Sequence, residues 1–254
     1  MEIAEPTLLA DVASWDQRVD VVVAGLGVAG ASAALEAHRA GADVLVLERA
    51  SGGGGASATS EGIFYLGGGT KLQLDLGYAD DADNMYAFMR ASTSAPDDDV
   101  LRAFCDGAVE HFDWLEGQGV PFQRREFTGK AVAVRTGEGL LTTGNEKLWP
   151  FTGAARPLPR GHQTRADGKE GGGAPAMRAL VASVQREGIA VRYDTGVIGL
   201  VVDDAGRVRG VHVREVGGRS GFIEARRGVI LATGSFNLSE EMTRRNIPVV
   251  AEHS

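Results

Sequence analysis

The chain has 254 residues, 43% of them hydrophobic, and a formal net charge of −8 at pH 7. This length allows one large or two small domains, and the apolar content is sufficient for a buried core. A negative net charge without a stripe of Lys and Arg argues against a nucleic-acid partner, because phosphate contacts require clustered positive charge.

The first predicted elements form a β-α-β unit. Residues 21–24 are apolar and favour a buried strand, and an apolar helix is predicted from Val28 to Ala40. A second apolar strand over residues 44–47 ends at Glu48. This order of elements is typical of a dinucleotide-binding unit. The turn that joins the first strand to the helix has the spacing G-x-G-x-x-G, formed by Gly25, Gly27 and Gly30.

Each part of this unit has a role in binding a dinucleotide. The first glycine allows the tight turn, the second lets the backbone approach a pyrophosphate, and the third lets the helix pack closely on the strand. The phosphates then lie at the positive N-terminus of the helix, which begins with Val28 and Ala29. Glu48 can accept hydrogen bonds from an adenosine ribose, and its charge disfavours a 2′-phosphate. The motif alone suits FAD and a nicotinamide cofactor equally well.

A second glycine-rich segment runs from Ser51 to Gly62 and leads into residues 63–70. One interpretation is a flexible linker. The other, which we favour, is a segment that wraps closely along an extended ligand. Glycines and hydroxyl residues permit this, because they allow backbone amides to turn toward phosphates.

Two amphipathic helices are predicted next, over residues 81–92 and 97–116, and acidic residues cap the N-terminus of the second helix. His111 lies beside the apolar stripe of the second helix and is expected to be a structural side chain. The inward-facing apolar residues are expected to be Met85, Phe88, Met89, Val100, Phe104, Phe112 and Leu115.

The second half of the chain begins without periodicity. Between Val120 and Gly173, Gly, Pro, Thr and Arg dominate, so we expect an irregular segment. A buried strand over residues 228–232 is expected to return parallel to the first strand and to place Thr233 and Gly234 near the dinucleotide. Between these segments we expect a helix over 174–187, a strand over 189–193, and an antiparallel meander of strands 197–203, 207–214 and 221–225.

Membrane, secreted and metal-binding classes find little support. The longest apolar stretch, residues 21–35, is interrupted by glycines and is too short to span a bilayer. The acidic start lacks the features of a secretion signal, so a cytoplasmic protein is expected. Cys105 is the only cysteine, which excludes an intrachain disulfide, and the five histidines lack metal-ligand spacing. No metal site is expected.

The motifs together resemble a known family of flavoproteins. They are the early glycine motif, Glu48-Arg49, the Gly54-Gly55 doublet with Ser57, the meander from Asp204, and the late Ala232-Thr233-Gly234. This set is similar to FAD enzymes of the fumarate reductase and succinate dehydrogenase superfamily. Within it, the segments that look most like 3-ketosteroid Δ4-(5α)-dehydrogenases are Tyr65–Thr70, Glu110–Leu115, Gly119–Phe122 and Pro159–His162.

The resemblance implies an α/β, Rossmann-like FAD-binding fold of the glutathione-reductase type, with a parallel sheet and an inserted antiparallel β-meander. It implies contact of the Val197 backbone with adenine, and closure of the site by Ala232, Thr233 and Gly234. The adenosine diphosphate half of FAD would be held by Gly25, Gly27, Val28, Ala29, Gly30, Glu48 and Arg49. The stretch from the pyrophosphate to the flavin would be held by Gly55, Ala56, Ser57, Ser60 and Gly62.

Three comparisons with the resembled family refine these expectations. Glu61 stands where relatives usually have a glycine next to the flavin, so either its side chain turns outward or that stretch is altered. Residues 49–70 contain no histidine, the residue that carries covalent flavin in respiratory members, so a non-covalent FAD is expected. Relatives also continue into a substrate-capping domain and a C-terminal flavin segment. We therefore interpret residues 1–254 as an N-terminal FAD-binding domain and assign no catalytic residue.

The implied reaction inserts a carbon-carbon double bond beside a ketone of a small hydrophobic, steroid-like substrate, with hydride transfer to flavin and reoxidation by an external electron acceptor. Tyr65 and His162 are candidates for lining the substrate side, and a packing role is the alternative for each. Two other functions remain open. One is a fumarate-reductase-like reduction of an unsaturated acid, and the other is an FAD-binding module without activity.

Overall fold

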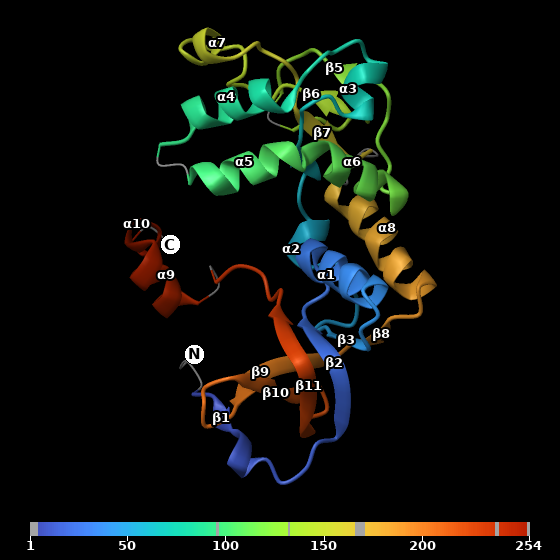
Figure 1. Cartoon of the computed structure of the whole chain (residues 1–254), viewed down its shortest axis with the longest axis vertical. Helices are drawn as coiled ribbons and strands as arrows, with labels where there is room; N and C mark the ends of the chain where they lie inside the picture. Colours follow the sequence, from blue (N-terminus) through green and yellow to red (C-terminus); the bar gives the residue numbers. More distant parts are fainter. Residues whose placement is uncertain (1–4, 95–96, 132, 166–170, 237–238, 253–254) are drawn as a thin grey trace. The chain divides into compact units, whose positions relative to one another are not determined.

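The chain folds into two compact units, whose elements are labelled in Figure 1. Unit 1 comprises residues 1–56 and 181–254, and unit 2 comprises residues 57–180. The structure is a computed structural model, and it describes residues 5–94, 97–131, 133–165, 171–236 and 239–252.

Unit 1 is built on a seven-stranded sheet with the strand order β1-β9-β10-β11-β2-β3-β8. Strand β11 pairs with β2, β2 with β3, and β3 with β8 in parallel. Strands β9, β10 and β11 pair in order as an antiparallel meander. The strands are β1 (Thr7–Leu8), β2 (Gln17–Ala24), β3 (Val44–Leu47), β8 (Ala190–Arg192), β9 (Thr195–Val202), β10 (Val208–Glu215) and β11 (Ser220–Leu231). The expected parallel sheet with an inserted meander is confirmed.

Helix α1 (Val28–Arg39) covers the central strands of this sheet, since it lies against β2, β3 and β11. Its buried positions include Ala31, Ala34 and Leu35, and the small alanines allow the helix to approach the strands closely. All four residues of β3 are buried, as expected for a parallel strand that is covered on both faces.

Strand β11 differs from the expectation of two separate strands over residues 221–225 and 228–232. It runs without a break from Ser220 to Leu231, with a register shift against β2 between Ala225 and Gly228. Its first part pairs with both β10 and β2, and its second part pairs with β2 alone. A bulge of this kind bends a strand without ending it, so the last strand of the meander is also the neighbour of the glycine-turn strand.

Unit 2 contains a four-stranded sheet with the order β4-β7-β6-β5. Three of these strands come from residues 120–173, where we expected only irregular structure. The strands are very short, so they lack the alternating pattern that a longer strand would show. The elements are β4 (Ile63–Tyr65), β5 (Glu126–Phe127), β6 (Leu140–Leu141), β7 (Gly161–Gln163), α3 (Lys71–Asp75), α4 (Ala82–Ser92) and α7 (Phe151–Ala154).

The single helix expected over residues 97–116 is two helices, α5 (Asp98–Asp106) and α6 (Ala108–Gly117). They join at Gly107, which ends the first helix and begins the second. Each short helix buries its own residues, Cys105 on α5 and Ala108, Phe112 and Leu115 on α6. Phe112 and Leu115 on α6 are buried as expected, but Val100 and Phe104 on α5 are 67% and 40% exposed. Those two positions were therefore predicted wrongly.

The remaining elements agree with the expected order. Helix α8 (Gly173–Arg186) matches the helix predicted over 174–187. The Asp97 side chain caps α5 as predicted, since it accepts from Val100 N–H. Cys105 is buried on α5, as expected for a small hydrophobic side chain. The other helices are η1 (Leu9–Asp11), α2 (Gly55–Ala58), α9 (Glu240–Asn246) and α10 (Pro248–Ala251).

A fully buried ion pair joins distant segments of unit 2. The Arg160 guanidinium donates to Asp80 through Nε at 2.8 Å and Nη2 at 2.9 Å, and both side chains are 0% exposed. Asp80 also accepts hydrogen bonds from Gly68 N–H and from the Asn84 amide. Burial raises the pKa of Asp80, but the hydrogen bonds from Arg160 and Asn84 outweigh burial and bring it to about 2. The pair therefore stays ionised at neutral pH.

Replacing Asp80 with Asn should destabilise the chain strongly, because Arg160 would be left as an uncompensated buried charge. We expect a loss of about 3–5 kcal/mol in the free energy of unfolding, measured by urea denaturation. Asp106→Asn is the matched control, because Asp106 pairs with Arg102 at an exposed position. It should cost less than about 1 kcal/mol, and equal losses in the two variants would contradict the proposed role of the buried pair.

Candidate functional site

The glycine turn of unit 1 is a place of very close backbone approach. Gly25 N–H donates to Leu47 O at 2.8 Å, and Ala232 N–H donates to Ala24 O at 2.9 Å. A Cβ added at Gly25 would lie 2.4 Å from Ala232 O, and one added at Gly30 would lie 2.0 Å from Gly25 O. The turn, α1 and the end of β11 therefore meet with no room for a side chain, as predicted for the third glycine.

The N-terminus of α1 is suited to an anion. Gly27 is its N-cap residue, and among the described residues no side chain caps this end and no acidic residue lies in its first turn. The partial positive charge of the helix end is therefore not neutralised by an acidic residue in the first turn of the helix. A phosphate group would find both the backbone N–H groups and the favourable helix dipole here.

Glu48 is held at the edge of the glycine turn. Its Oε2 accepts from Leu26 N–H at 2.8 Å, and its Oε1 accepts from Ala50 N–H at 2.9 Å. An ionised carboxylate has further lone pairs, so the fixed side chain can still accept from a ribose hydroxyl. The neighbouring Arg49 is exposed, and its stem lies over Gly196 of β9.

Most of the predicted residues of unit 1 gather where β2, β3 and β11 end. Ala232 directly follows the end of β11, and the next two residues, Thr233 and Gly234, are exposed, as are Gly55 and Ala56. Val197 lies apart from this group in β9, where it packs against the hydrophobic core. Strand β9 links Val197 to this group, because Thr195 N–H at the start of the strand donates to Glu48 O at 3.0 Å.

The predicted residues of unit 2 lie in one ordered turn. Ser60 Oγ–H donates to Ser57 O at 2.8 Å, and Ser60 Oγ accepts from Gly62 N–H at 3.2 Å. Gly62 has a φ of +67°, and a Cβ there would lie 2.2 Å from the carbonyl carbon of Gly172. Gly172 N–H in turn donates to Glu61 O at 3.1 Å. These contacts define the backbone of residues 57–62 and argue against the linker interpretation.

Glu61 is neither turned fully outward nor isolated. Its Oε1 pairs with Arg135 Nη2 at 2.5 Å, and its side chain is 34% exposed. The sequence analysis did not identify Arg135 or Gln163, although the Gln163 amide donates to Glu61 O at 3.1 Å. No sequence signal links these positions, because the contacts join segments about seventy to a hundred residues apart.

His162 has the surroundings of a structural side chain. It is fully buried, its Nδ1–H donates to Arg160 O at 3.0 Å, and its Nε2 lies 2.7 Å from Thr70 Oγ1. Its ring also packs against Phe112. Since both ring nitrogens have partners within unit 2, the packing interpretation is favoured over contact with a substrate.

The polar group of Tyr65 has fewer hydrogen-bond partners than that of His162. Its ring packs near Phe88, and its hydroxyl is buried with no hydrogen bond to the described residues. Burial and the charge of Glu146 raise the pKa of the phenol, so it is neutral at pH 7.

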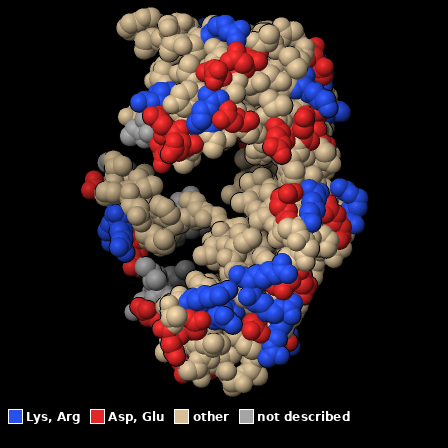
Figure 2. All heavy atoms as spheres, in the orientation of Figure 1, with Lys and Arg blue, Asp and Glu red and all other residues tan. Residues whose placement is uncertain are grey.

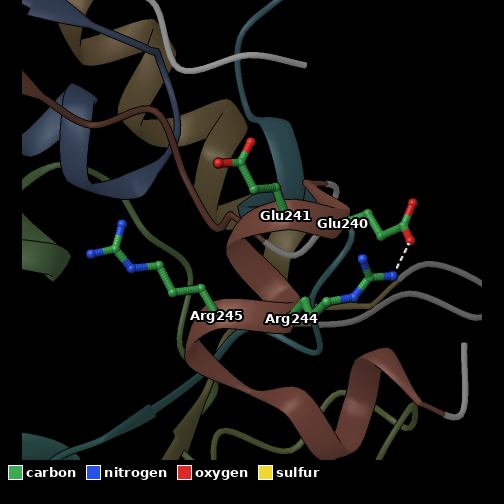
Figure 3. A pocket seen from close by; sticks show the side chains of 4 residues that line it. All are labelled: Glu240, Glu241, Arg244 and Arg245. Carbon is green, nitrogen blue, oxygen red and sulfur yellow. Dashed lines mark hydrogen bonds and ion pairs between the residues drawn. The ribbon is translucent and has the colours of Figure 1, made fainter.

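Surface features elsewhere among the described residues are a small hollow and mixed charges. Figure 3 shows a hollow on α9 lined by Glu240, Glu241, Arg244 and Arg245, where Glu240 pairs with Arg244 and the other two side chains extend away. Figure 2 shows Lys and Arg side chains standing beside Asp and Glu on the visible face. The expectation that nucleic acid is not a partner remains a prediction.

Two further features are absent from the part of the chain that the structure describes. There, no group of three or more His, Cys, Asp and Glu side chains is arranged to hold a metal ion. No helix within the described ranges is long and apolar enough to cross a membrane.

Comparisons with known proteins identify the family. A family model described as "FAD binding domain" matches residues 20–254. The chain belongs to this FAD-binding family. Its cofactor is accordingly FAD, as the resemblance of the motifs implied.

Relatives of this FAD-binding chain include steroid dehydrogenases and reductases of unsaturated acids. A 3-oxo-5-alpha-steroid 4-dehydrogenase from Comamonas testosteroni is 36% identical over 80% of this chain and 39% of its own length. An acrylate reductase flavoprotein subunit from Shewanella woodyi is 30% identical over 95% of this chain and 44% of its own length. The chain thus spans less than half the length of these two curated relatives.

A solved structure is similar over nearly the whole FAD-binding chain. It is the 3-ketosteroid-delta4-(5alpha)-dehydrogenase from Rhodococcus jostii RHA1 in complex with 4-androstene-3,17-dione. The TM-score is 0.91 and the identity is 43%, and the match covers 96% of this chain and 52% of that one. The expected fold and family are confirmed.

The geometry of unit 1 fits FAD. The cradle at Gly25 and Gly30 is closed to side chains, the N-terminus of α1 accepts an anion, and Glu48 offers a fixed acceptor. These three features match the backbone, phosphate and ribose requirements of a dinucleotide.

Gly30→Ala should abolish this fit, because the added Cβ would lie 2.0 Å from the carbonyl oxygen of Gly25 and push α1 away from the turn. We expect FAD affinity to fall at least about tenfold and the free energy of unfolding to fall by about 1–3 kcal/mol. Gly228→Ala is the control in the same unit, because its Cβ would meet nothing within 4 Å. FAD titration and urea denaturation measure both effects, and normal FAD binding by Gly30→Ala would refute the prediction.

His162 should make the stability of the chain depend on pH. Burial lowers its pKa to about 4, against 6.5 when it is exposed. The unfolded chain therefore binds more protons between these values, and the free energy of unfolding should fall by about 2 kcal/mol from pH 7 to pH 5. His162→Gln should remove this contribution, and the exposed His38→Gln should not. Urea denaturation at both pH values tests the difference, and identical pH dependence in all three proteins would contradict it.

Proposed function

We propose that this chain is the FAD-binding part of an oxidoreductase that introduces a carbon-carbon double bond beside the ketone of a small hydrophobic, steroid-like substrate. The observation that carries the proposal is the similarity to the Rhodococcus ketosteroid dehydrogenase, with 43% identity and a TM-score of 0.91 over 96% of this chain. The similarity to the Comamonas enzyme supports the same substrate class.

The residues that we propose for binding FAD belong partly to unit 1 and partly to unit 2. In unit 1, the glycine turn with Val28 and Ala29 would hold the pyrophosphate, Glu48 and Arg49 the adenosine, and the Val197 backbone the adenine. Gly55 and Ala56 would continue the cradle, and Ala232, Thr233 and Gly234 would close it. In unit 2, Ser57, Ser60 and Gly62 would lie along the stretch toward the flavin.

FAD would supply the acceptor for a hydride. Its attachment is proposed to be non-covalent, because residues 49–70 contain no histidine. The residues named above would bind the cofactor and orient it. The hydrogen bond between Ser60 and Gly62 would hold the backbone of the turn in a fixed position.

The reaction would remove two hydrogens from adjacent carbons. One would leave as a hydride to the flavin and the other as a proton to a base, and an external electron acceptor would then take up the two electrons. We assign no catalytic residue. The occupied ring nitrogens of His162 give it no free group for this role. The cytoplasmic location expected from the sequence also stays a prediction.

A second function is reduction of an unsaturated acid. The acrylate reductase flavoprotein subunit is 30% identical over 95% of this chain, a greater coverage than that of the Comamonas steroid enzyme. Such a reaction would reverse the direction of hydride transfer and would use a carboxylate as substrate.

The first test is the visible absorption spectrum of the purified chain after incubation with FAD and removal of free cofactor. Flavin bands that acid precipitation releases are the expected result. Glu48→Ala should lower FAD affinity roughly tenfold or more, since a hydrogen bond to a charged group is worth about 1.5–3 kcal/mol. Glu36→Ala, at an exposed position of α1, should bind FAD normally. A folded chain that remains colourless would contradict the proposed site.

The second test compares substrates with the FAD-loaded chain. Any turnover should be the dehydrogenation of a saturated 3-oxo-5α-steroid with an artificial electron acceptor, and acrylate with a reduced donor should not be consumed. Consumption of acrylate alone would favour the second function. Bound FAD without either reaction would indicate that the chain by itself is a cofactor-binding module.

A further inference from the structure

An apolar tip stands on the surface of unit 2, directly before α7. Its two large side chains, Leu148 and Trp149, are 52% and 86% exposed, and Trp149 is the most exposed large hydrophobic side chain among the described residues. Figure 2 shows a lobe without charged side chains where α7 lies in Figure 1. Tryptophan contributes strongly to the free energy of an interface when it is buried. Two adjacent side chains of this kind therefore mark a candidate contact surface.

The backbone on both sides of this tip is held in place. On one side, Glu146 is 1% exposed, and its carboxylate accepts from Thr143 N–H at 3.1 Å and from Gly144 N–H at 3.0 Å. On the other side, the Phe151 ring packs edge-to-face against Phe88, with the ring centroids 5.9 Å apart. The tryptophan between these two anchors is therefore presented to solvent by an ordered segment, so less conformational entropy is lost when it binds.

The exposed charges of this segment differ from those of the chain as a whole. The chain has a net charge of −8, but Glu146 is the only acid between residues 143 and 157, and it is buried. Lys147 is exposed and directly precedes the apolar tip. Arg156, near the end of the segment, pairs with Asp81 at 2.6 Å. The segment therefore presents exposed positive charge and no exposed negative charge of its own.

These features suit a lipid surface better than a second protein. A stable protein interface buries about 800 Å² on each partner and involves about 20–30 residues a side, which two adjacent side chains cannot supply. A bilayer surface accepts a smaller contact, because tryptophan is favoured at the boundary between headgroups and acyl chains and leucine buries its side chain among the acyl chains. Anionic headgroups attract a lysine that lies close to the membrane.

We propose that Leu148 and Trp149 dock this chain on the surface of a bilayer that contains anionic lipid, with Lys147 at the level of the lipid phosphates. The contact is peripheral, because only side chains of one loop tip enter the lipid. It is also weak and reversible, since the inserted apolar area is small. The inference rests on unit 2 alone and requires neither bound FAD nor the proposed function.

Co-sedimentation with vesicles of phosphatidylcholine and phosphatidylglycerol measures this contact. Trp149→Ser should weaken binding at least about tenfold, because the inserted apolar area supplies most of the affinity. Lys147→Gln should weaken it about fivefold, and only on vesicles that contain phosphatidylglycerol. Val216→Ser is the matched control, because Val216 is 77% exposed in a turn of unit 1, and it should bind like the unchanged chain.

Quenching by brominated phosphatidylcholine reports on the tip directly, because brominated acyl chains quench only a tryptophan close to them. The unchanged chain should be quenched, and Trp149→Phe should still bind the vesicles but lose most of the quenching. Urea denaturation should give Trp149→Ser and the unchanged chain the same free energy of unfolding, since the side chain is exposed. Leu148→Ser is a second variant with the same expected loss of binding.

Absence of vesicle binding by the unchanged chain would overturn the inference, and so would full binding by both Trp149→Ser and Leu148→Ser. Quenching that Trp149→Phe retains would also overturn it, because another tryptophan would then lie in the lipid. Sedimentation equilibrium tests the remaining occupant. A dimer that Trp149→Ser converts to a monomer would show that the tip binds a second copy of the chain and not a bilayer.

Discussion

Close backbone contact around Gly25 and Gly30 is the constraint on which unit 1 depends. Added Cβ atoms at these positions would lie 2.4 Å and 2.0 Å from carbonyl oxygens, so only glycine lets β2, α1 and β11 meet in this way. The contact places the N-terminus of α1 next to the end of β3. Glu48 can then accept from Leu26 N–H, and the positive helix end lies beside a fixed carboxylate. The proposed phosphate and ribose contacts both follow from this one packing requirement.

Unit 2 depends on polar contacts buried in its interior. Its strands are very short and supply few ladder hydrogen bonds, so the Arg160–Asp80 pair and the His162–Thr70 contact hold segments that the sheet alone would not. A buried ion pair is stable only when further hydrogen bonds satisfy it, and Asp80 receives them from Gly68 and Asn84. The ordered turn at Ser60 and Gly62 is part of the same unit, where β4 pairs with β7. This arrangement gives the proposed flavin segment a rigid support.

The parts of the fold that could be predicted are those with local signals. Apolar strands, the glycine spacing and the cap residue Asp97 act within a few residues, and the corresponding elements were confirmed. The errors arose where a local signal was ambiguous. Gly107 interrupts a pattern that otherwise continues across α5 and α6, and the register shift in β11 resembles a turn when only its sequence is considered. The short strands of unit 2 carry too few residues for any period to be recognised.

The sequence by itself determined that this chain has a dinucleotide-binding unit. The glycine spacing and the acid after the second strand are local requirements of that unit, so they can be recognised from neighbouring residues alone. It also identified the flavoprotein family through the combination of its motifs, which the match to residues 20–254 confirmed. Only the tertiary structure decided which distant side chains meet. Glu61 with Arg135 and Asp80 with Arg160 are brought together by strand pairing and loop packing. Such pairs leave no pattern along the chain, because contact between distant segments depends on the whole fold and not on their spacing in sequence.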